Sequence, residues 1–372
     1  MSNQNRRADG YIGLMSGTSL DGVDAALVRF HPTGRMELDA FITHSYPTAL
    51  KTALNRLNET PTLSLKQLCT FEREVAAEFV QATQTLLKQT SVPKQDIIAI
   101  GSHGQTIFHA PSLSMSLQIG HPAFIAKGTG VTTVADFRID DMANHGQGAP
   151  LAPAFHRVLF QVEDPIAVIN IGGIANISYL SPTQSLGFDI GPGNGLMDDV
   201  CRAELNCDYD PNGDLAADAQ PNQAWLNQLL SDPYFSLPFP KTTGKDYFNQ
   251  AWLKQSLDRF AAAANMSAQE KLSTLNQLTV ETLKQGIASL PAPPSEILIS
   301  GGGADNATLL KRLQQQSLCP VRTTRELGIS PHAIEAMMCA WLAKQRLDNQ
   351  PIGLKTITGA HQDSILGGVW AP

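Results

Sequence analysis

The sequence predicts an α/β protein built from two domains. Its 372 residues are 42% hydrophobic and 16% charged, which is enough apolar material for two packed cores of ordinary size. Short apolar runs typical of strands alternate with segments of helical spacing. Each half also opens with two strand-like runs around a glycine-rich turn, which indicates a pseudo-duplicated architecture with a ligand cleft between the halves. We place the domains at 1–163 and 164–372, and the last helix is allowed to return to the first domain.

The first half begins with two strand-like runs that are joined by a glycine-rich turn, as in a hairpin. A third strand, a helix and two further strands follow, and the first of these two is expected to open into a polar loop. The predicted ranges are strands at 11–17, 23–30, 36–46, 96–101 and 131–135 and a helix at about 64–89.

The second half repeats this order with three strands in close succession and a helix. A stretch rich in proline and aromatic residues, 232–248, is expected to be an irregular surface loop. The predicted ranges are strands at 166–171, 174–180, 186–191 and 296–300, a helix from about 195, a helix that opens near 306, and an amphipathic helix at 332–347.

Composition narrows the class of partner. A net charge of −7 argues against a large nucleic-acid-binding face. The five cysteines form no CxxC pair, so we expect reduced thiols and neither a disulfide framework nor a zinc ribbon. The apolar runs are too short to span a bilayer, and the first ten residues make a poor secretory signal. We therefore expect a cytoplasmic protein that binds a small molecule and neither nucleic acid nor membrane, with a homodimer left open.

The first chemical signal is a glycine-rich turn between the first two strands. Its glycines allow close backbone approach to a ligand, and its hydroxyls and peptide N–H groups suit phosphate oxygens. Its two acids would repel phosphates, so a divalent cation, Mg²⁺, is expected to bind through phosphates and water with no direct protein ligand. The alternative is a hairpin turn whose polar side chains only cap backbone groups. The residues are Gly17, Thr18, Ser19, Leu20, Asp21, Gly22, Val23 and Asp24.

Two further glycine-rich turns recur where a phosphate clamp would need them. The segment 170–176 makes a tight turn early in the second half. The segment 300–306 follows a buried strand and opens a helix, with Asn306 or Asp305 as its cap. In this order and spacing the three turns resemble the phosphate-1, phosphate-2 and adenosine segments of the superfamily of acetate kinase, sugar kinases, Hsp70 and actin.

A fourth segment, 187–194, narrows the choice. Asp189 stands at the end of a strand beside a glycine-rich turn, where it is suited to act as a base or, alternatively, to form the turn or cap a helix. With LMSGTSLDGVD, GSHGQTIFH, NIGGIANIS and ISGGGADN, the chain resembles the anhydro-N-acetylmuramic acid kinase family over nearly its whole length. Leu20 and Ile190 depart from the Met and Thr that are common there, and the second change concerns a hydroxyl near the site.

The resemblance implies two actin-like (ribonuclease H-like) domains with an interdomain nucleotide cleft. It also implies a kinase that uses ATP and water to open a 1,6-anhydro sugar and phosphorylate its O6 during cell-wall peptidoglycan recycling. Asp189 would then be the catalytic base. The ATP-binding residues would be Gly17 to Asp24, Gly172, Gly173, Asn176, Gly301, Gly302, Gly303 and Asn306.

Substrate contacts are predicted at further positions in both halves. His103 and Gln105 follow a strand and suit sugar hydroxyls, unless the histidine only bonds backbone. Arg138 suits a carboxylate or N-acetyl group, or else an ion pair with a nearby aspartate. Glu335 is expected to line the cleft. The remaining predicted contacts are Gly191, Gly193 and Asn194.

Two rivals remain at this stage. A kinase for a free sugar or a carboxylate on the same scaffold would use Asp189 to deprotonate the acceptor. An actin-like or chaperone-like ATPase would couple hydrolysis to conformational change, but no additional peptide-binding domain is evident.

Overall fold

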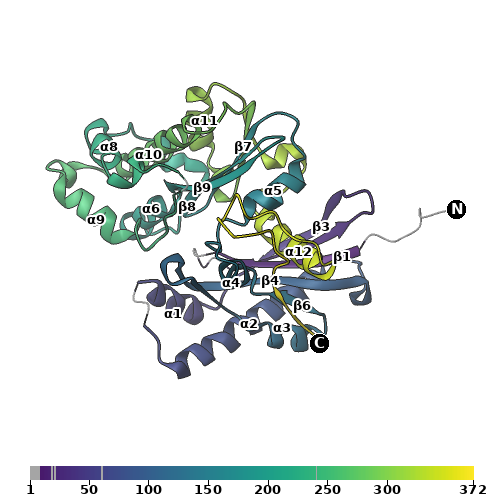
Figure 1. Ribbon diagram of the computed structural model, residues 1–372. Helices are drawn as coiled ribbons and strands as arrows, with labels where there is room; N and C mark the ends of the chain where they lie inside the picture. Colours follow the sequence, from purple (N-terminus) through teal and green to yellow (C-terminus); the bar gives the residue numbers. More distant parts are fainter. Residues whose placement is uncertain (1–8, 18–19, 21, 60–61, 240) are drawn as a thin grey trace. The chain divides into compact units, whose positions relative to one another are not determined.

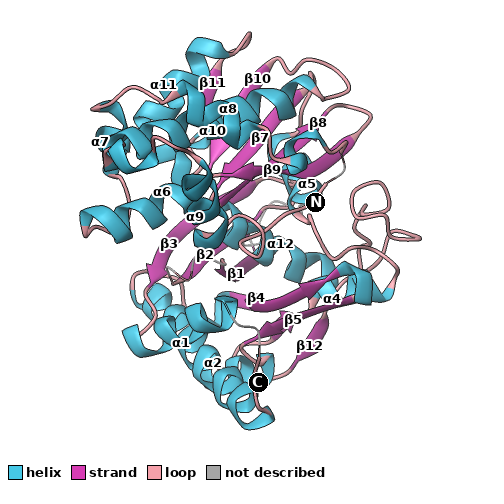
Figure 2. Ribbon diagram, turned by 90° about the vertical axis from the view of Figure 1, so that its left-hand side faces the viewer, coloured by secondary structure: helices cyan, strands magenta, loops and turns pink. Residues whose placement is uncertain are grey.

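The computed structural model describes residues 9–17, 20, 22–59, 62–239 and 241–372 (Figure 1). The chain divides into two compact units, Met1–Leu159 with Ala333–Pro372 and Phe160–His332. Each unit contains one β-sheet covered by helices (Figure 2), so the predicted α/β class with two sheet-bearing units is confirmed. Among the described residues, no helix combines the length and the hydropathy that a membrane crossing requires.

The sheet of the first unit has the strand order β12-β6-β4-β1-β2-β3, with β5 paired to β4. β1 is antiparallel to β2 and parallel to β4. The strands are β1 (Asp9–Ser16), β2 (Val23–Phe30), β3 (Met36–His44), β4 (Ile97–Ala110), β5 (Met115–Ile119), β6 (Thr133–Ala135) and β12 (Gly368–Trp370). The helices are α1 (Thr48–Glu59), α2 (Leu65–Lys88), α3 (Pro122–Thr129), α4 (Phe137–Ala143), α5 (Ala152–Phe160) and α12 (Ile334–Leu347).

Helix α2 covers the sheet of the first unit and begins where the sequence predicts. Ser64 caps it by accepting a hydrogen bond from Gln67 N, and the Gln67 side chain completes a capping box. Its buried stripe, which includes Val75 and Phe79, joins the core formed with Ile12 and Leu14 of β1. The strand β1 is buried along nearly all of its length, which explains its continuous apolar sequence.

Helix α12 differs from its prediction. An amphipathic helix was expected, but the helix is buried around most of its circumference, from Ala336 to Ala343. It packs on β1 and β4 at two glycines. A Cβ on Gly13 would lie 1.7 Å from Ala336 O, and one on Gly101 would lie 1.9 Å from Cys339 O. Only glycine allows the helix backbone to approach the sheet this closely.

The end of β4 also differs from the prediction. Residues 102–106 were expected to form a polar loop after a strand, but β4 runs through them to Ala110, and Gln105 and Thr106 pair with β5. Gln105 therefore lies between Ser16 of β1 and Ile119 of β5, and His103 lies where the register of β4 with β1 shifts.

The sheet of the second unit has the order β11-β10-β7-β8-β9, with β9 at one edge. The strands are β7 (Ile166–Ile171), β8 (Ile174–Leu180), β9 (Ser185–Pro192), β10 (Glu296–Ser300) and β11 (Val321–Thr323). The helices are α6 (Gly195–Val200), α7 (Asp214–Ala217), α8 (Gln223–Leu230), α9 (Gln250–Arg259), α10 (Ala268–Ala288) and α11 (Ala307–Gln316).

The aromatic-rich segment 232–248 is irregular, as predicted, but it is not merely a surface loop. Tyr234, Phe235 and Phe248 are buried in the core of the second unit. The rings of Phe235 and Phe248 stack with centroids 5.5 Å apart. Residues 233–236 form a single 3₁₀ turn. The segment is thus held against the sheet by its own aromatic side chains.

Candidate functional site

The turn between β1 and β2 is supported from β4. Thr18, Ser19 and Asp21 lie outside the described residues. Gln105 Nε2 donates to Gly17 O at 3.3 Å, and Ser16 Oγ lies 2.6 Å from Gln105 Oε1 and 2.8 Å from Gly22 O. Gln105 is 1% exposed, so its amide holds the turn in place. Its predicted contact with substrate remains a prediction.

Gly22 is required where the turn meets β2. Its φ is 155°, and a Cβ there would lie 2.3 Å from His44 O, so a side chain is excluded. The next residue but one, Asp24, accepts a hydrogen bond from Thr43 Oγ1 at 2.6 Å. Leu20 is buried and Val23 is 0% exposed, so these two residues anchor the turn in the core.

His103 and Arg138 form a fixed pair in the first unit. Arg138 Nε donates to His103 Nε2 at 2.8 Å and Arg138 Nη1 donates to Gly148 O at 2.9 Å. Because Nε2 accepts, Nδ1 carries the proton and donates to Gly104 O at 3.0 Å. Burial, helped by the Arg138 charge, lowers the pKa of His103 to about 3. A neutral histidine thus orients a guanidinium group.

Glu335 on α12 belongs to the same cluster. Burial raises its pKa, the charge of Asp24 raises it further, and Arg138 opposes both. The cluster contains Asp24 of β2, His103 of β4, Arg138 of α4 and Glu335 of α12. Residues separated by more than 300 positions are therefore brought within electrostatic reach. This combination of one cation and two carboxyl groups suits a polar ligand that itself carries charge.

The neutral state of His103 predicts a pH effect on stability. In the unfolded chain the pKa of His103 returns to the ordinary 6.5. Below that pH, His103 is therefore protonated in the unfolded state but stays neutral in the folded state. His103 therefore lowers the free energy of unfolding by up to about 1.4 kcal/mol per pH unit as the pH drops from 6.5 towards 3, and the similar contribution of His156 is the same in wild type and variant. His103→Gln should remove this slope relative to wild type.

Urea unfolding at pH 7, 6 and 5 measures the difference between the two proteins. Buried carboxyls with raised pKa, such as Asp141 and Glu72, act in the opposite direction but cancel between variant and wild type. Equal slopes in the two proteins would show that His103 is protonated in the folded state.

A row of polar residues crosses the sheet of the second unit. Ser300 of β10 is paired with Asn170 of β7, Asn170 with Asn176 of β8, and Asn176 with Asp189 of β9. Residues directly opposite one another share a face of the sheet. Asn170, Asn176 and Asp189 are all partly exposed, and the row lies near the carboxyl ends of the parallel strands β7 and β10, where α/β sheets bind ligands. Asn170 was not among the predicted site residues.

Three predicted glycine-rich segments meet beside this row: 170–176, 187–194 and 300–306. Asn194 N donates to Gly172 O at 2.8 Å and Gly193 N to Gly173 O at 3.0 Å. Two of the glycines leave no room for a side chain. A Cβ on Gly193 would lie 2.3 Å from Gly172 O, and a Cβ on Gly303 would lie 2.4 Å from the Ile171 Cβ. Gly302 differs, because its nearest neighbour, Asn194 Nδ2, would be an ordinary 3.5 Å away. The glycines therefore have structural roles in addition to any ligand contact.

Two remaining positions are fixed by local geometry. Gly301 has φ 73° and Gly191 has φ 151°, both in the region that favours glycine.

Of the two predicted caps, Asn306 caps α11 by accepting from Leu309 N at 2.9 Å. Asp305 instead pairs with Arg325 and His332.

Asp189 is held by the aromatic-rich segment, a contact that sequence analysis did not foresee. Thr242 Oγ1 and Thr243 N donate to Asp189 Oδ2 at 2.8 and 3.0 Å. Asp189 N donates to Lys241 O at 2.9 Å, and Tyr234 OH donates to Asp189 O at 2.7 Å. The sequence signal that could have predicted this contact is the polar run KTTGK within an otherwise aromatic stretch.

Ile190 lies on the other side of the strand. Asn176 is opposite Asp189 and Ala175 is opposite Gly191, so Ile190 is the extra residue of a bulge. Its side chain is 2% exposed and packs near Gly286 of α10. Isoleucine in place of the threonine common at this position therefore changes the core and not the surface that carries Asp189.

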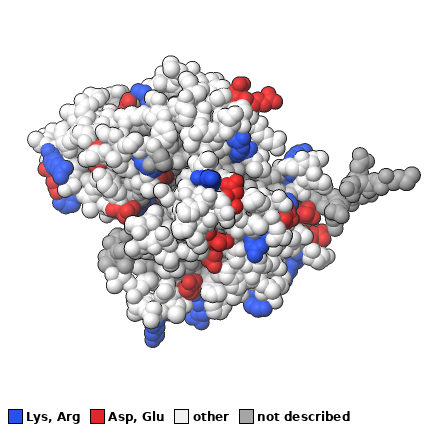
Figure 3. All heavy atoms as spheres, in the orientation of Figure 1, with Lys and Arg blue, Asp and Glu red and all other residues white. Residues whose placement is uncertain are grey.

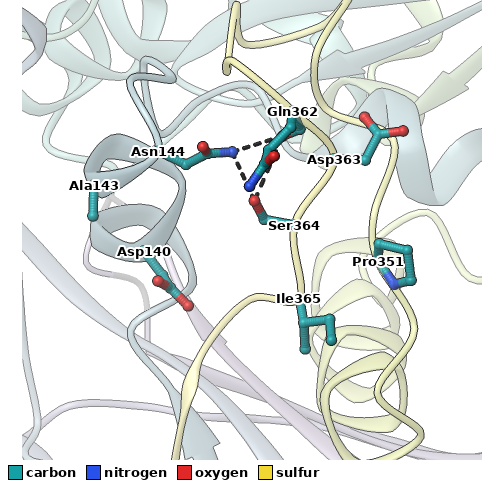
Figure 4. A pocket seen from close by; sticks show the side chains of 8 residues that line it. All are labelled: Asp140, Ala143, Asn144, Pro351, Gln362, Asp363, Ser364 and Ile365. Atoms are coloured by element: carbon teal, nitrogen blue, oxygen red, sulfur yellow. Dashed lines mark hydrogen bonds between the residues drawn. The ribbon is translucent and has the colours of Figure 1, made fainter.

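A depression of about 510 Å³ lies elsewhere, on the first unit (Figure 4). Asn144 Nδ2 donates across it to Gln362 O and Ser364 Oγ, each at 2.6 Å. These bonds attach the C-terminal segment to α4, and no predicted site residue lines the depression. On the face drawn in Figure 3, Lys and Arg lie scattered among Asp and Glu, with no continuous basic area over the described residues.

Comparison with known proteins tests the resemblance. The model of the anhydro-N-acetylmuramic acid kinase family matches residues 9–372. A protein of that name from Hydrogenovibrio crunogenus is 60% identical over 362 residues, which cover 97% of this chain and 98% of that protein. Another from Shewanella denitrificans is 45% identical over 366 residues, which cover 96% and 97%.

Solved structures are more distant. Component A of (R)-2-hydroxyglutaryl-CoA dehydratase from Acidaminococcus fermentans aligns with a TM-score of 0.48 and 9% identity over 89% of this chain and 96% of that one, which is too low to carry an argument. The sequence relatives decide the assignment, because they match both in identity and over nearly the full length. The chain therefore belongs to the anhydro-N-acetylmuramic acid kinase family.

Proposed function

We propose that this chain uses ATP and water to convert 1,6-anhydro-N-acetylmuramic acid into N-acetylmuramic acid 6-phosphate and ADP. The observation that carries the proposal is the 60% identity, over 97% of the chain, to a protein named for this kinase activity. The reaction would serve the recycling of cell-wall peptidoglycan in the cytoplasm.

The chemistry requires ring opening and phosphoryl transfer together, because the anhydro sugar has no free O6. Asp189 takes a proton from a water molecule that attacks the anomeric carbon, and the bond from that carbon to O6 breaks. O6 then attacks the γ-phosphoryl group of ATP, and ADP leaves. The phosphoryl group takes the place of the acid used by ordinary glycosidases, so one catalytic carboxylate suffices.

ATP binding is assigned to the glycine-rich turns. The turn from Gly17 to Asp24 and the turn at Gly172–Gly173 would hold the phosphates, and the segment from Gly301 to Asn306 would hold the adenosine. The row that contains Asn176 supports this assignment, because it stands beside the second and third turns and ends at Asp189.

Sugar recognition is assigned to the cluster around Arg138. The proposed substrate carries a lactyl carboxylate, and a guanidinium group suits a carboxylate through paired hydrogen bonds. The fixed orientation of Arg138 by His103 and Gly148 supports this role, because a pre-oriented side chain loses less conformational entropy on binding. Glu335 would accept hydrogen bonds from sugar hydroxyl or amide groups.

Magnesium is proposed as the accompanying ion. It is assigned to the ATP phosphates and water, because Mg²⁺ usually keeps several waters and binds few protein groups. Asp24, beside the first turn, is a candidate to contact its water shell. When bound, the ion neutralises the charge of the phosphates.

Chelation supplies a test of this assignment. With EDTA in excess, turnover should fall by at least about tenfold and return on addition of MgCl₂ or MnCl₂. The melting temperature in the absence of nucleotide should not change, since the ion is assigned to the nucleotide phosphates and water and not to the protein. Full turnover after exhaustive chelation would contradict the role of the ion.

The proposed reaction is distinguished from that of a free-sugar kinase by isotope labelling. In H₂¹⁸O, the anomeric hydroxyl of the product gains one ¹⁸O if Asp189 activates water, which mass spectrometry of the freshly formed product detects. Because an anomeric hydroxyl exchanges slowly with water by itself, the product incubated alone in H₂¹⁸O is the control. Phosphorylation of free N-acetylmuramic acid, with no turnover of the anhydro sugar, would overturn the proposal.

A further inference from the structure

Asp189 lies on β9, the edge strand of its sheet, and an edge strand leaves backbone groups without a strand partner. At Asp189 those groups are satisfied by Tyr234 and Lys241 of the aromatic-rich segment. Lys241 O accepts from Asp189 N at 2.9 Å, and Tyr234 OH donates to Asp189 O at 2.7 Å. Tyr234 and Lys241 therefore cover the open edge of the sheet at the residue proposed as the base.

The same segment also holds the Asp189 carboxylate. Thr242 Oγ1 and Thr243 N both donate to Oδ2, at 2.8 and 3.0 Å. Two donors on one oxygen restrict rotation of the carboxylate, and hydrogen bonds donated to a carboxylate favour its ionised form. Both effects are what a general base requires.

The segment is itself firmly supported. Asp232 accepts hydrogen bonds from Tyr234 N, Tyr247 OH and Trp252 Nε1, at 2.9, 2.9 and 2.8 Å. Lys241 Nζ donates to Tyr234 O at 3.1 Å and lies 4.5 Å from the centre of the Tyr234 ring. The donors that reach Asp189 thus belong to a segment that is attached through Asp232 and through the buried rings of Tyr234, Phe235 and Phe248.

We propose that Thr242 is a positioning residue, which orients the Asp189 carboxylate and favours its ionised form. This inference rests on the proposed function, because Asp189 must be the base for its orientation to affect turnover. Thr242 contacts Asp189 through its hydroxyl. Replacement of Thr242 by valine, which has the same shape but no hydroxyl, therefore removes this hydrogen bond.

The experiment compares Thr242→Val with Thr242→Ser, which keeps the hydroxyl. Thr70→Val is the matched control, because within the described part of the chain the Thr70 hydroxyl bonds its own helix α2, to Lys66 O at 2.9 Å. In Thr242→Val we expect kcat to fall about three- to tenfold with little change in KM for either substrate. The acid limb of the pH profile should move to higher pH by about half a unit or more. Thr242→Ser should restore both, and Thr70→Val should behave as wild type.

A second readout needs no substrate. ¹³C NMR of labelled aspartate carboxyls, with the Asp189 signal assigned from Asp189→Asn, follows ionisation directly, and Thr242→Val should move its midpoint in the same direction as the pH profile. An unchanged midpoint would overturn the inference whether or not the protein turns over the anhydro sugar. Failure of wild type to turn over that sugar, with a shifted midpoint, would instead reject the proposed function alone.

Discussion

Asp189→Asn should lower kcat by about 10²- to 10⁴-fold or more, because loss of a positioned general base typically has this effect. The asparagine side chain has the same shape, and its carbonyl oxygen can still accept from Thr242 Oγ1 or Thr243 N, which bond Oδ2 in the wild type. The fold and the edge contacts of the Asp189 backbone should therefore persist.

Nucleotide affinity separates loss of chemistry from loss of structure. Since ATP binding is assigned to the glycine-rich turns, the Kd for ATP measured by calorimetry should stay within about twofold of wild type, a difference of about 0.4 kcal/mol. Asp258→Asn is the control, because Asp258 is exposed on α9 and pairs with Lys254. A kcat near that of wild type in Asp189→Asn would show that another group takes the proton.

Gly13→Ala should destabilise the first unit by about 3 kcal/mol or more, at the upper end of the range for overpacked sites. The added Cβ would lie 1.7 Å from Ala336 O and 2.7 Å from Ala340 N. Both are backbone atoms of α12, so no side chain can rotate away and the helix must leave the sheet. Because α12 also carries Glu335, activity should fall with stability.

Gly353→Ala is the matched control in the same unit. Its nearest heavy atom would be Asp363 Oδ2 at 3.9 Å, so the free energy of unfolding should change by less than about 0.5 kcal/mol. Urea unfolding followed by circular dichroism compares the two variants. If Gly13→Ala unfolds at the wild-type urea concentration, α12 does not rest on β1 as closely as described.

The local sequence determined most elements and the chemistry of the turns. Ser64 with Gln67 signals the start of α2, and Asn306 signals the start of α11, because a cap acts on residues within one helical turn. The glycines at 172–173 and 301–303 stand out because tight turns and close contacts restrict residue choice locally. The identity of Asp189 as the candidate base followed from such a turn.

Only the tertiary structure decided which distant residues meet. The sequence does not show that Thr242 donates to Asp189, that His103 fixes Arg138, or that Glu335 approaches both Arg138 and Asp24. Each of these contacts joins positions far apart in the chain, and no local period encodes them. The same reason explains α12. Its sequence was expected to form an amphipathic helix, yet two glycines on separate strands allow its backbone to lie close to the sheet, and the helix is buried nearly all round.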